Sequence, residues 1–174
     1  MNQHDAAAAP LRSGNDSRLQ ALNAALDTLT DPEIPVVTLR EMGILRAVRL
    51  DAGDQVEVVI TPTYSGCPAM DVIADDIRAV LAAQGMAGRV VTQLSPAWTT
   101  DWMSDHGKRK LEEYGIAPPT GKAAVNGPIM IQMAVKCPQC HSLNTREVTR
   151  FGSTACKALY TCNDCLEPFD YFKV

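Results

Sequence analysis

The chain has 174 residues, which at about 150 residues per domain corresponds to one full domain and a smaller second unit. Hydrophobic residues make up 46% of the chain and charged residues 21%, a composition that excludes collagen-like and wholly disordered proteins. Sixteen basic and twenty acidic side chains give a net charge of -4, so the whole protein lacks the positive charge typical of nucleic-acid-binding proteins.

The sequence shows no membrane or export signal. No apolar run reaches the roughly 18 residues that a membrane helix requires. The first residues lack a basic start followed by an apolar segment, so we expect a cytoplasmic protein with no membrane partner. Residues 1–15 are small, polar and without periodicity, and they are predicted to form a disordered tail. In a reducing compartment the six cysteines favour metal or thiol chemistry over disulfides.

A first helix is predicted from Ser17, which has the spacing of a capping box with Gln20. The two prolines of the Asp-Pro-Glu-Ile-Pro segment, residues 31–35, end this helix and exclude a helix in the segment itself. The resulting stiff loop presents Asp31 and Glu33, which could serve as oxygen ligands or as a general base. A solvated or capping role is the more common one for such carboxylates. The apolar face of the helix is formed by Leu19, Leu22, Leu26 and Leu29.

A turn and a hairpin are predicted next. Thr38 and Glu41 repeat the capping-box spacing and indicate a single helical turn. Residues 44–50 and 55–61 are rich in β-branched side chains and flank Asp-Ala-Gly-Asp, which predicts a β-hairpin. The side chains expected to face the core are Val56, Val58 and Ile60.

A second helix is expected between Pro68 and Gly85, because its apolar residues recur at helical spacing. A third strand is predicted over residues 89–94, followed by a polar helical stretch that ends near Tyr114. The resulting order predicts an α+β fold, with helices on one side of a small sheet.

The chain divides into two units of different charge. Residues 1–120 carry 10 basic and 16 acidic side chains, a net charge of -6, whereas residues 136–174 carry five and four, a net charge of +1. We predict an α+β domain over residues 16–115, a linker rich in Gly, Pro and Ala over residues 116–134, and a cysteine-rich domain over residues 135–174. The small positive charge gives little affinity for phosphate, so nucleic acid is not expected as a partner.

Two CxxC pairs predict a metal site in the C-terminal unit. Cys137 and Cys140 form one pair, Cys162 and Cys165 form the other, and 21 residues separate them. Each two-residue gap lets a tight turn bring both thiolates to one metal, and four thiolates complete a tetrahedral shell with no open position. Such a closed site is structural, and zinc is favoured over iron. A unit of about 40 residues needs the metal to fold, because it buries too little apolar surface.

The predicted metal-binding unit reads as a ribbon with strands over residues 145–151, residues 157–161 and around Phe169 to Phe172. Cys156 and His141 remain outside the four-cysteine set. Packing or surface roles are favoured for both, because four thiolates already fill the metal shell.

Cys67 is the one cysteine of the N-terminal unit, and it lies at the start of the second predicted helix. Free backbone amides there are expected to lower its pKa and to favour a thiolate that could act as a nucleophile or bind a soft metal. The alternative is a small buried hydrophobe. His106 is the one plausible base in this unit, but nothing in the sequence places it near Cys67. The GxGxxG, GxxxxGK[ST], HExxH and Glu-x-x-His patterns are absent, so no known oxygenase, dehydrogenase or ATPase centre is recognised.

Four segments together are similar to the iron–sulfur cluster assembly (FSCA) domain family, also called the metal–sulfur cluster biosynthetic family. They are residues 31–35, 42–44, 61–68 and 96–98. The resemblance covers about residues 17–115 and implies an α-β-β-α-β domain. Together with a four-cysteine ribbon containing residues 150–158 and 167–173, it extends to the family of accessory subunits of the phenylacetyl-CoA oxygenase system. That system epoxidises the aromatic ring in aerobic phenylacetate catabolism.

The resemblance implies that Cys67 handles iron or an iron–sulfur cluster, with Asp31 and Glu33 on the same functional face. It implies a noncatalytic subunit that matures or repairs an iron–sulfur or iron centre of the oxygenase or of its iron–sulfur reductase. Because a cluster needs about four thiolates, Cys67 would need a second copy of the chain or ligands from the client. The alternative is a structural docking subunit of the oxygenase that handles no cluster.

Overall fold

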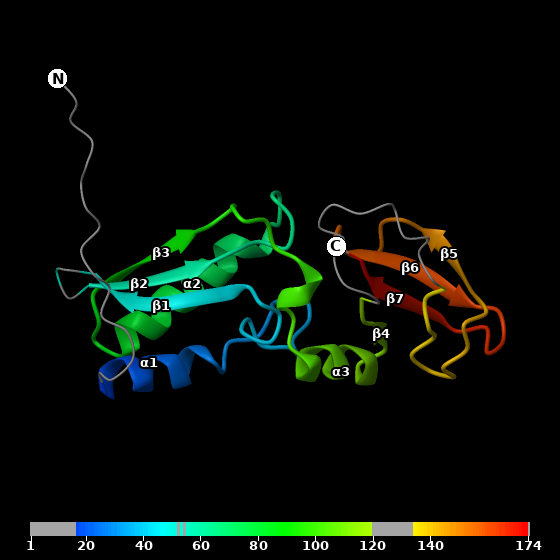
Figure 1. Ribbon diagram of the computed structural model, residues 1–174, viewed down its shortest axis with the longest axis horizontal. Helices are drawn as coiled ribbons and strands as arrows, with labels where there is room; N and C mark the ends of the chain where they lie inside the picture. The colour runs from blue at the N-terminus through cyan, green and yellow to red at the C-terminus, as the bar shows by residue number, and fades with distance from the viewer. Residues whose placement is uncertain (1–16, 52, 54, 120–133, 174) are drawn as a thin grey trace, which may run out of the picture.

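The computed structural model describes residues 17–51, 53, 55–119 and 134–173. Figure 1 shows two units side by side, which we call the N-terminal unit (residues 17–115) and the C-terminal ribbon (residues 134–173). The predicted tail, residues 1–15, and most of the predicted linker lie outside the described residues. In the described part of the chain, no helix is long and apolar enough to cross a membrane.

The N-terminal unit is built on a three-stranded sheet in the order β1-β2-β3. β1 (Leu45–Leu50) and β2 (Val56–Ile60) pair antiparallel as the predicted hairpin. β3 (Gly88–Thr92) runs parallel to β2, which requires a crossover, and α2 (Ala69–Ala83) supplies it. With α1 (Ser17–Leu26) preceding the hairpin, the α-β-β-α-β order is confirmed.

One apolar core lies between this sheet and the two helices that cover it (Figure 1). Val56, Val58 and Ile60 alternate along β2 and are at most 1% exposed, which confirms the predicted core face. The two helices bury side chains at helical spacing against it. These are Leu19, Leu22, Leu26, Ile73, Ile77 and Leu81.

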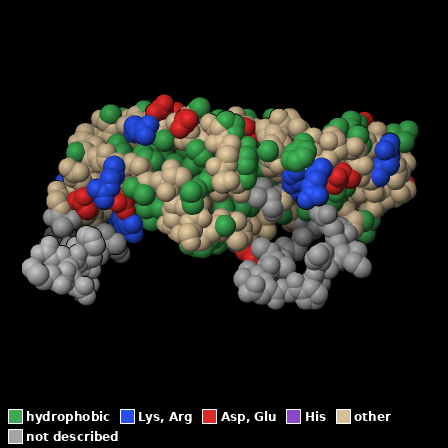
Figure 2. Space-filling view, turned by 90° about the horizontal axis from the view of Figure 1, so that it is seen from above, with side chains coloured by type: hydrophobic (Ala, Val, Ile, Leu, Met, Phe, Trp, Pro, Cys, Tyr) green, Lys and Arg blue, Asp and Glu red, His purple; other side chains and the backbone are tan. Residues whose placement is uncertain are grey.

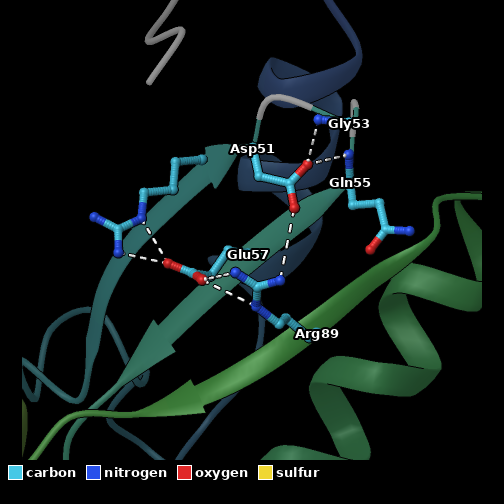
Figure 3. Close-up of polar contacts among 6 residues, drawn as sticks. Asp51, Gly53, Gln55, Glu57 and Arg89 are labelled. Atoms are coloured by element: carbon cyan, nitrogen blue, oxygen red, sulfur yellow. Dashed lines mark hydrogen bonds and ion pairs between the residues drawn. The ribbon is translucent and has the colours of Figure 1, made fainter. Parts of the chain in front are cut away.

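The opposite face of the sheet carries a row of charges across all three strands (Figure 3). Glu57 on β2 lies opposite Arg49 on β1 and Arg89 on β3 in the strand register. One carboxylate oxygen of Glu57 accepts from Arg49 at 2.5 Å, and the other accepts from Arg89 at 2.6 Å. Asp51 accepts two backbone N–H groups of the hairpin turn. These pairs fix the register, although exposed ion pairs contribute little stability.

After β3 the chain crosses one end of the sheet through η1 (Thr100–Trp102) and α3 (Asp105–Glu113). The 38–43 segment beside them forms the predicted capping box, in which the Thr38 N–H donates to Glu41 Oε2 at 2.9 Å and the Glu41 N–H donates to Thr38 Oγ1 at 3.2 Å. Gly43 ends the turn at φ 76°, and a Cβ there would lie 2.7 Å from the Trp102 carbonyl oxygen. Only glycine fits this position.

The C-terminal ribbon is a four-stranded sheet in the order β4-β7-β6-β5. β5 (Thr145–Thr149), β6 (Lys157–Cys162) and β7 (Pro168–Phe172) are the three predicted strands, and neighbouring pairs are antiparallel. The fourth strand, β4 (Ile116–Ala117), pairs parallel with β7 although its residues were expected in the linker. Two residues are too few to show any periodicity, so the sequence does not reveal this strand.

The core of the N-terminal unit extends to the ribbon at their interface, and a second apolar cluster lies within the ribbon. Phe172, at the end of β7, is 1% exposed and meets Trp98 edge to face, with the ring centres 6.0 Å apart. The Trp98 indole N–H donates to the Met42 carbonyl at 3.1 Å, which fixes the ring. Cys156 of the ribbon belongs to the same buried cluster. Figure 2 shows hydrophobic side chains gathered over the middle of one face of the molecule, with charged side chains on both sides.

Glu41 joins the 38–43 turn to α3. Its carboxylate accepts from Lys110 Nζ at 2.9 Å and lies 2.6 Å from Nδ1 of His106. Burial acts to raise the pKa of Glu41, but the Thr38 N–H, Lys110 and His106 together lower this pKa to about 2.

Replacing Glu41 with glutamine removes the negative charge from this contact. We expect Glu41→Gln to lower the free energy of unfolding by about 1–2 kcal/mol at neutral pH. The folded pKa of about 2 lies below the ordinary value of 4.5, so the stabilisation is present above 4.5 and is lost as the pH falls from there toward the folded pKa. Urea unfolding at a series of pH values measures the difference between the two proteins.

Glu113→Gln, at an exposed position on the same helix, is the matched control and should show no such difference. If the difference in free energy of unfolding between the wild type and Glu41→Gln did not shrink in acid, the stabilising role of the Glu41 carboxylate would be contradicted.

Candidate functional site

Four cysteine sulfurs come together in the ribbon and lie within 4.8 Å of one another. The Sγ atoms of Cys137 and Cys165 are 3.7 Å apart, and those of Cys140 and Cys162 are 3.5 Å apart. A tetrahedral zinc ion with Zn–S bonds of about 2.3 Å separates its sulfur ligands by about 3.8 Å. The donor set therefore fits one tetrahedral metal ion. In the described ranges no second group of three or more potential ligands is as closely gathered.

Backbone N–H groups stabilise the thiolate of Cys162, whereas the pKa values of Cys140 and Cys165 are raised. The N–H groups of Cys165 and Asp164 donate to the Cys162 sulfur and lower its pKa to about 7. The residue after each CxxC pair has a left-handed backbone, with φ 63° at His141 and 67° at Leu166. This conformation costs a side-chain-bearing residue about 1–2 kcal/mol. Metal binding to the ordered turns is the term that offsets this cost.

β6 connects the four-cysteine group to the interface between the units. Cys162 ends the strand within the metal-binding group, whereas Cys156 precedes its first residue and lies in the shared core. Six residues of strand span about 20 Å. A metal held by the ribbon cysteines is therefore too far from the interface to share a ligand with it.

The loop at residues 31–35 is fixed by Asp31, which is 7% exposed. Its Oδ1 accepts the N–H groups of Glu33 at 2.8 Å and of Ile34 at 3.0 Å, which is a capping role. Burial is the main cause of the raised pKa of Asp31. Asp31 thus sets the shape of the loop, and Glu33 is the carboxylate of this loop that meets the ribbon.

Cys67 lies two residues before α2 and is half-buried. The predicted lowering of its pKa is wrong, because burial raises the pKa of Cys67 and outweighs the Ala69 N–H that donates to the sulfur. The carboxylates of Glu33 and Asp31 raise this pKa further. The thiol is therefore neutral at physiological pH.

Cys156 is buried, as a packing residue would be, but it also faces Glu33. Its thiol donates to Glu33 Oε2 at 3.9 Å and lies 3.0 Å from Thr154 Oγ1. Burial raises the pKa of Cys156, and the Glu33 carboxylate adds to the effect. Sequence reasoning missed this contact because 123 residues separate the two side chains. The one sequence feature that could have pointed to this contact is that Cys156 is a ribbon cysteine without a CxxC partner.

Lys157 supplies positive charge beside these groups. It is 6% exposed, and its Nζ lies 3.3 Å from Asp170 Oδ2. Burial and the Asp31 carboxylate raise the pKa of Glu33, whereas Lys157 and Cys156 lower it. A groove of about 440 Å³ lined in part by Glu33, Lys157 and Asp170 lies at the interface. Glu33 is therefore accessible from solvent.

The histidines of the described chain have other contacts. His106, the candidate base, lies 2.6 Å from Glu41, and His141 lies 3.6 Å from Glu112. Neither of these contacts involves Cys67.

Each of the two units matches a known protein family. The family described as "Iron-sulfur cluster assembly protein" matches residues 19–94. The family described as "PaaD zinc beta ribbon domain" matches residues 124–173.

Individual relatives cover one or both units. A protein of Escherichia coli (strain K12), provisionally named as one of the subunits of 1,2-phenylacetyl-CoA epoxidase, is 46% identical over 86% of this chain and 89% of its own length. An Fe-S protein maturation auxiliary factor of Porphyromonas gingivalis (strain ATCC BAA-308 / W83) is 35% identical over 49% of this chain and 83% of its own. A crystal structure of a domain of unknown function, DUF59, from Bacillus anthracis has a TM-score of 0.49 and 26% identity, covering 55% of this chain and 92% of that one.

The E. coli relative matches along most of its length, and the matched ribbon domain is specific to one family. The chain therefore belongs to the PaaD family.

Proposed function

We propose that this protein is a noncatalytic accessory subunit of a phenylacetyl-CoA ring epoxidase system. It matures or repairs an iron–sulfur or iron centre of the oxygenase or of its iron–sulfur reductase, and the iron or cluster is its cargo. The E. coli relative, named as a subunit of such an epoxidase, supports the choice of system. The relative named as an Fe-S protein maturation auxiliary factor supports the role.

The surroundings of Cys67 carry this proposal. Its thiol lies close enough to Asp31 and Glu33 for both carboxylates to raise its pKa, after the larger effect of burial. Because the free thiol is neutral, an incoming metal displaces a proton, and the metal leaves when the proton returns. Reversible binding of this kind suits a carrier that receives and releases iron.

The same environment argues against a thiol enzyme. A nucleophilic cysteine needs a lowered pKa or an adjacent base. The pKa of Cys67 is raised, and the described histidines contact Glu41 and Glu112 instead. These observations support the noncatalytic role that we propose.

We assign zinc to the four ribbon cysteines as a structural ion. Four thiolates leave no open coordination position, so this site has no place for a substrate. The ion orders the turn between β6 and β7, which carries Cys162 and Cys165. The opposite ends of these strands bring Cys156 and Phe172 into the shared core.

The carrier role predicts the effect of Cys67→Ser in cells. In a strain that lacks the native protein, we expect this variant to leave phenylacetyl-CoA epoxidation at the level of the empty strain. The purified oxygenase and reductase should then contain less iron and acid-labile sulfide than in cells with the wild type. Ser65→Ala, at an exposed position in the same loop, is the matched control and should restore both. Full activity and iron content with Cys67→Ser would instead favour a structural docking subunit.

The structural zinc ion predicts the effect of metal removal. We expect Cys140→Ser to reduce zinc from about one per chain to near zero, because three thiolates hold it poorly. The ribbon should then become sensitive to protease, and the tryptophan fluorescence should shift to the red as Phe172 leaves Trp98. Cys67→Ser should keep its zinc and its protease resistance. A metal-free ribbon that remains protected would contradict a structural role.

A further inference from the structure

We propose that a groove beside Tyr114 is the docking site for the client, an inference that rests on the proposed function for the identity of the partner. The occupant is a segment of the oxygenase or of its reductase that carries a lysine or arginine next to an apolar side chain. The docked segment lies against the loop that holds Glu33.

The docking site consists of two hollows that meet at Tyr114. One, of about 440 Å³, is lined in part by Glu33 and Tyr114. The other, of about 330 Å³, is lined by Val36, Tyr114 and two charged residues of α3. Glu33 and Val36 belong to the same loop, so the hollows adjoin along it, and we call them together the Tyr114 groove. Pockets for small ligands measure about 300–1,000 Å³, so each hollow can admit a side chain of a partner.

The Tyr114 groove has an exposed aromatic side chain where its two hollows meet. Tyr114 is 54% exposed. Val36 adds apolar surface on one side of it, and Leu159 and Pro168 add more on the other. Tyrosine is common among the residues that carry most of the binding energy of an interface, because it combines a large apolar ring with a polar end. The groove therefore suits a protein segment with an apolar side chain.

The unpaired charges of the groove are negative. Its two lysines, Lys110 and Lys157, already form ion pairs with carboxylates, at 2.9 Å and 3.3 Å. Glu33 and Glu113 also line the groove, and neither forms an ion pair with another described residue. Two carboxylates are thus left for a basic side chain of a partner to compensate.

The same charges argue against a ligand that carries phosphate, such as a CoA thioester. Phosphate is bound by cations or by free backbone N–H groups. In this groove both lysines are paired, and the remaining charges would repel an anion. Residues 1–120 carry a net charge of -6, which extends the attraction for a basic partner beyond the groove itself.

Both units contribute to the Tyr114 groove. Glu33 and Tyr114 belong to the N-terminal unit, whereas Leu159 and Pro168 belong to the ribbon. A segment bound in the groove therefore contacts both units at once. The ribbon then supplies part of the docking site as well as the zinc-binding group.

The test measures binding of the full-length, zinc-loaded protein to the oxygenase and to the reductase, each purified from cells that lack the native protein. Biolayer interferometry at low and at moderate salt gives the affinity for each component. Tyr114→Ala removes the aromatic side chain, and Glu113→Lys reverses one unpaired charge. We expect each variant to bind roughly tenfold or more weakly to the component that the wild type binds. The wild-type affinity should fall as salt is raised.

Asp76→Lys, at an exposed position on α2, makes the same change of charge outside the groove and should bind as the wild type does. Zinc content and thermal unfolding check that the variants fold. Hydrogen exchange of the wild-type complex is the independent measurement, and it should slow over the 33–36 loop and at the end of α3 when the client binds.

Binding that Tyr114→Ala and Glu113→Lys leave unchanged would overturn the groove and leave the proposed function standing. An equal loss with Asp76→Lys would replace docking in the groove with general charge attraction, and would overturn the inference too. A wild type that sediments as a dimer, and as a monomer after Tyr114→Ala, would assign the groove to a second copy of the chain instead. No binding of the wild type to either component would overturn both the groove and the proposed function.

Discussion

Burial of Phe172 in the core of the N-terminal unit is the contact on which the arrangement of the two units depends. Full burial of such a side chain contributes about 1.5–3 kcal/mol, and the edge-to-face contact with Trp98 gives it a defined orientation. The next residue, Lys173, donates its N–H to the Cys156 carbonyl at 3.0 Å. Burial of Phe172 therefore also positions Cys156 and its contact with Glu33. Phe172 thus fixes one end of the ribbon against the core of the N-terminal unit, beside the β4–β7 pairing and the contact between Cys156 and Glu33.

The chain contains two chemically different classes of cysteine. In the ribbon, four sulfurs lie within 4.8 Å of one another, and backbone N–H groups lower the pKa of one of them, Cys162, to about 7. At the interface, burial raises the pKa of Cys67 and Cys156, and neighbouring carboxylates add to this effect. Four sulfurs that converge on one point suit a closed structural metal site, whereas each interface thiol retains its proton at neutral pH.

Periodicity accounts for what could be predicted from the sequence. The leucines of α1 and the alternating valines of β2 have regular spacing, and the CxxC pairs define their own ligand set, so these features were accessible. The two-residue strand β4 and the contact between Cys156 and Glu33 depend on residues far apart in the chain, and no local pattern records them. The pKa of Cys67 was predicted in the wrong direction because a helix terminus can be read from sequence, whereas burial cannot.

The length of β6 has a consequence for how this protein can evolve. Cys156 and Cys162 lie six positions apart, so both sulfurs depend on one uninterrupted strand. Insertion or deletion of a single residue would turn every following side chain to the other face of the sheet. Either the four-cysteine group would then lose Cys162 or the interface would lose Cys156. This ribbon is tied to its neighbour by a fixed count of residues, so lineages should tolerate length changes in the loop before Cys156 and none within the strand.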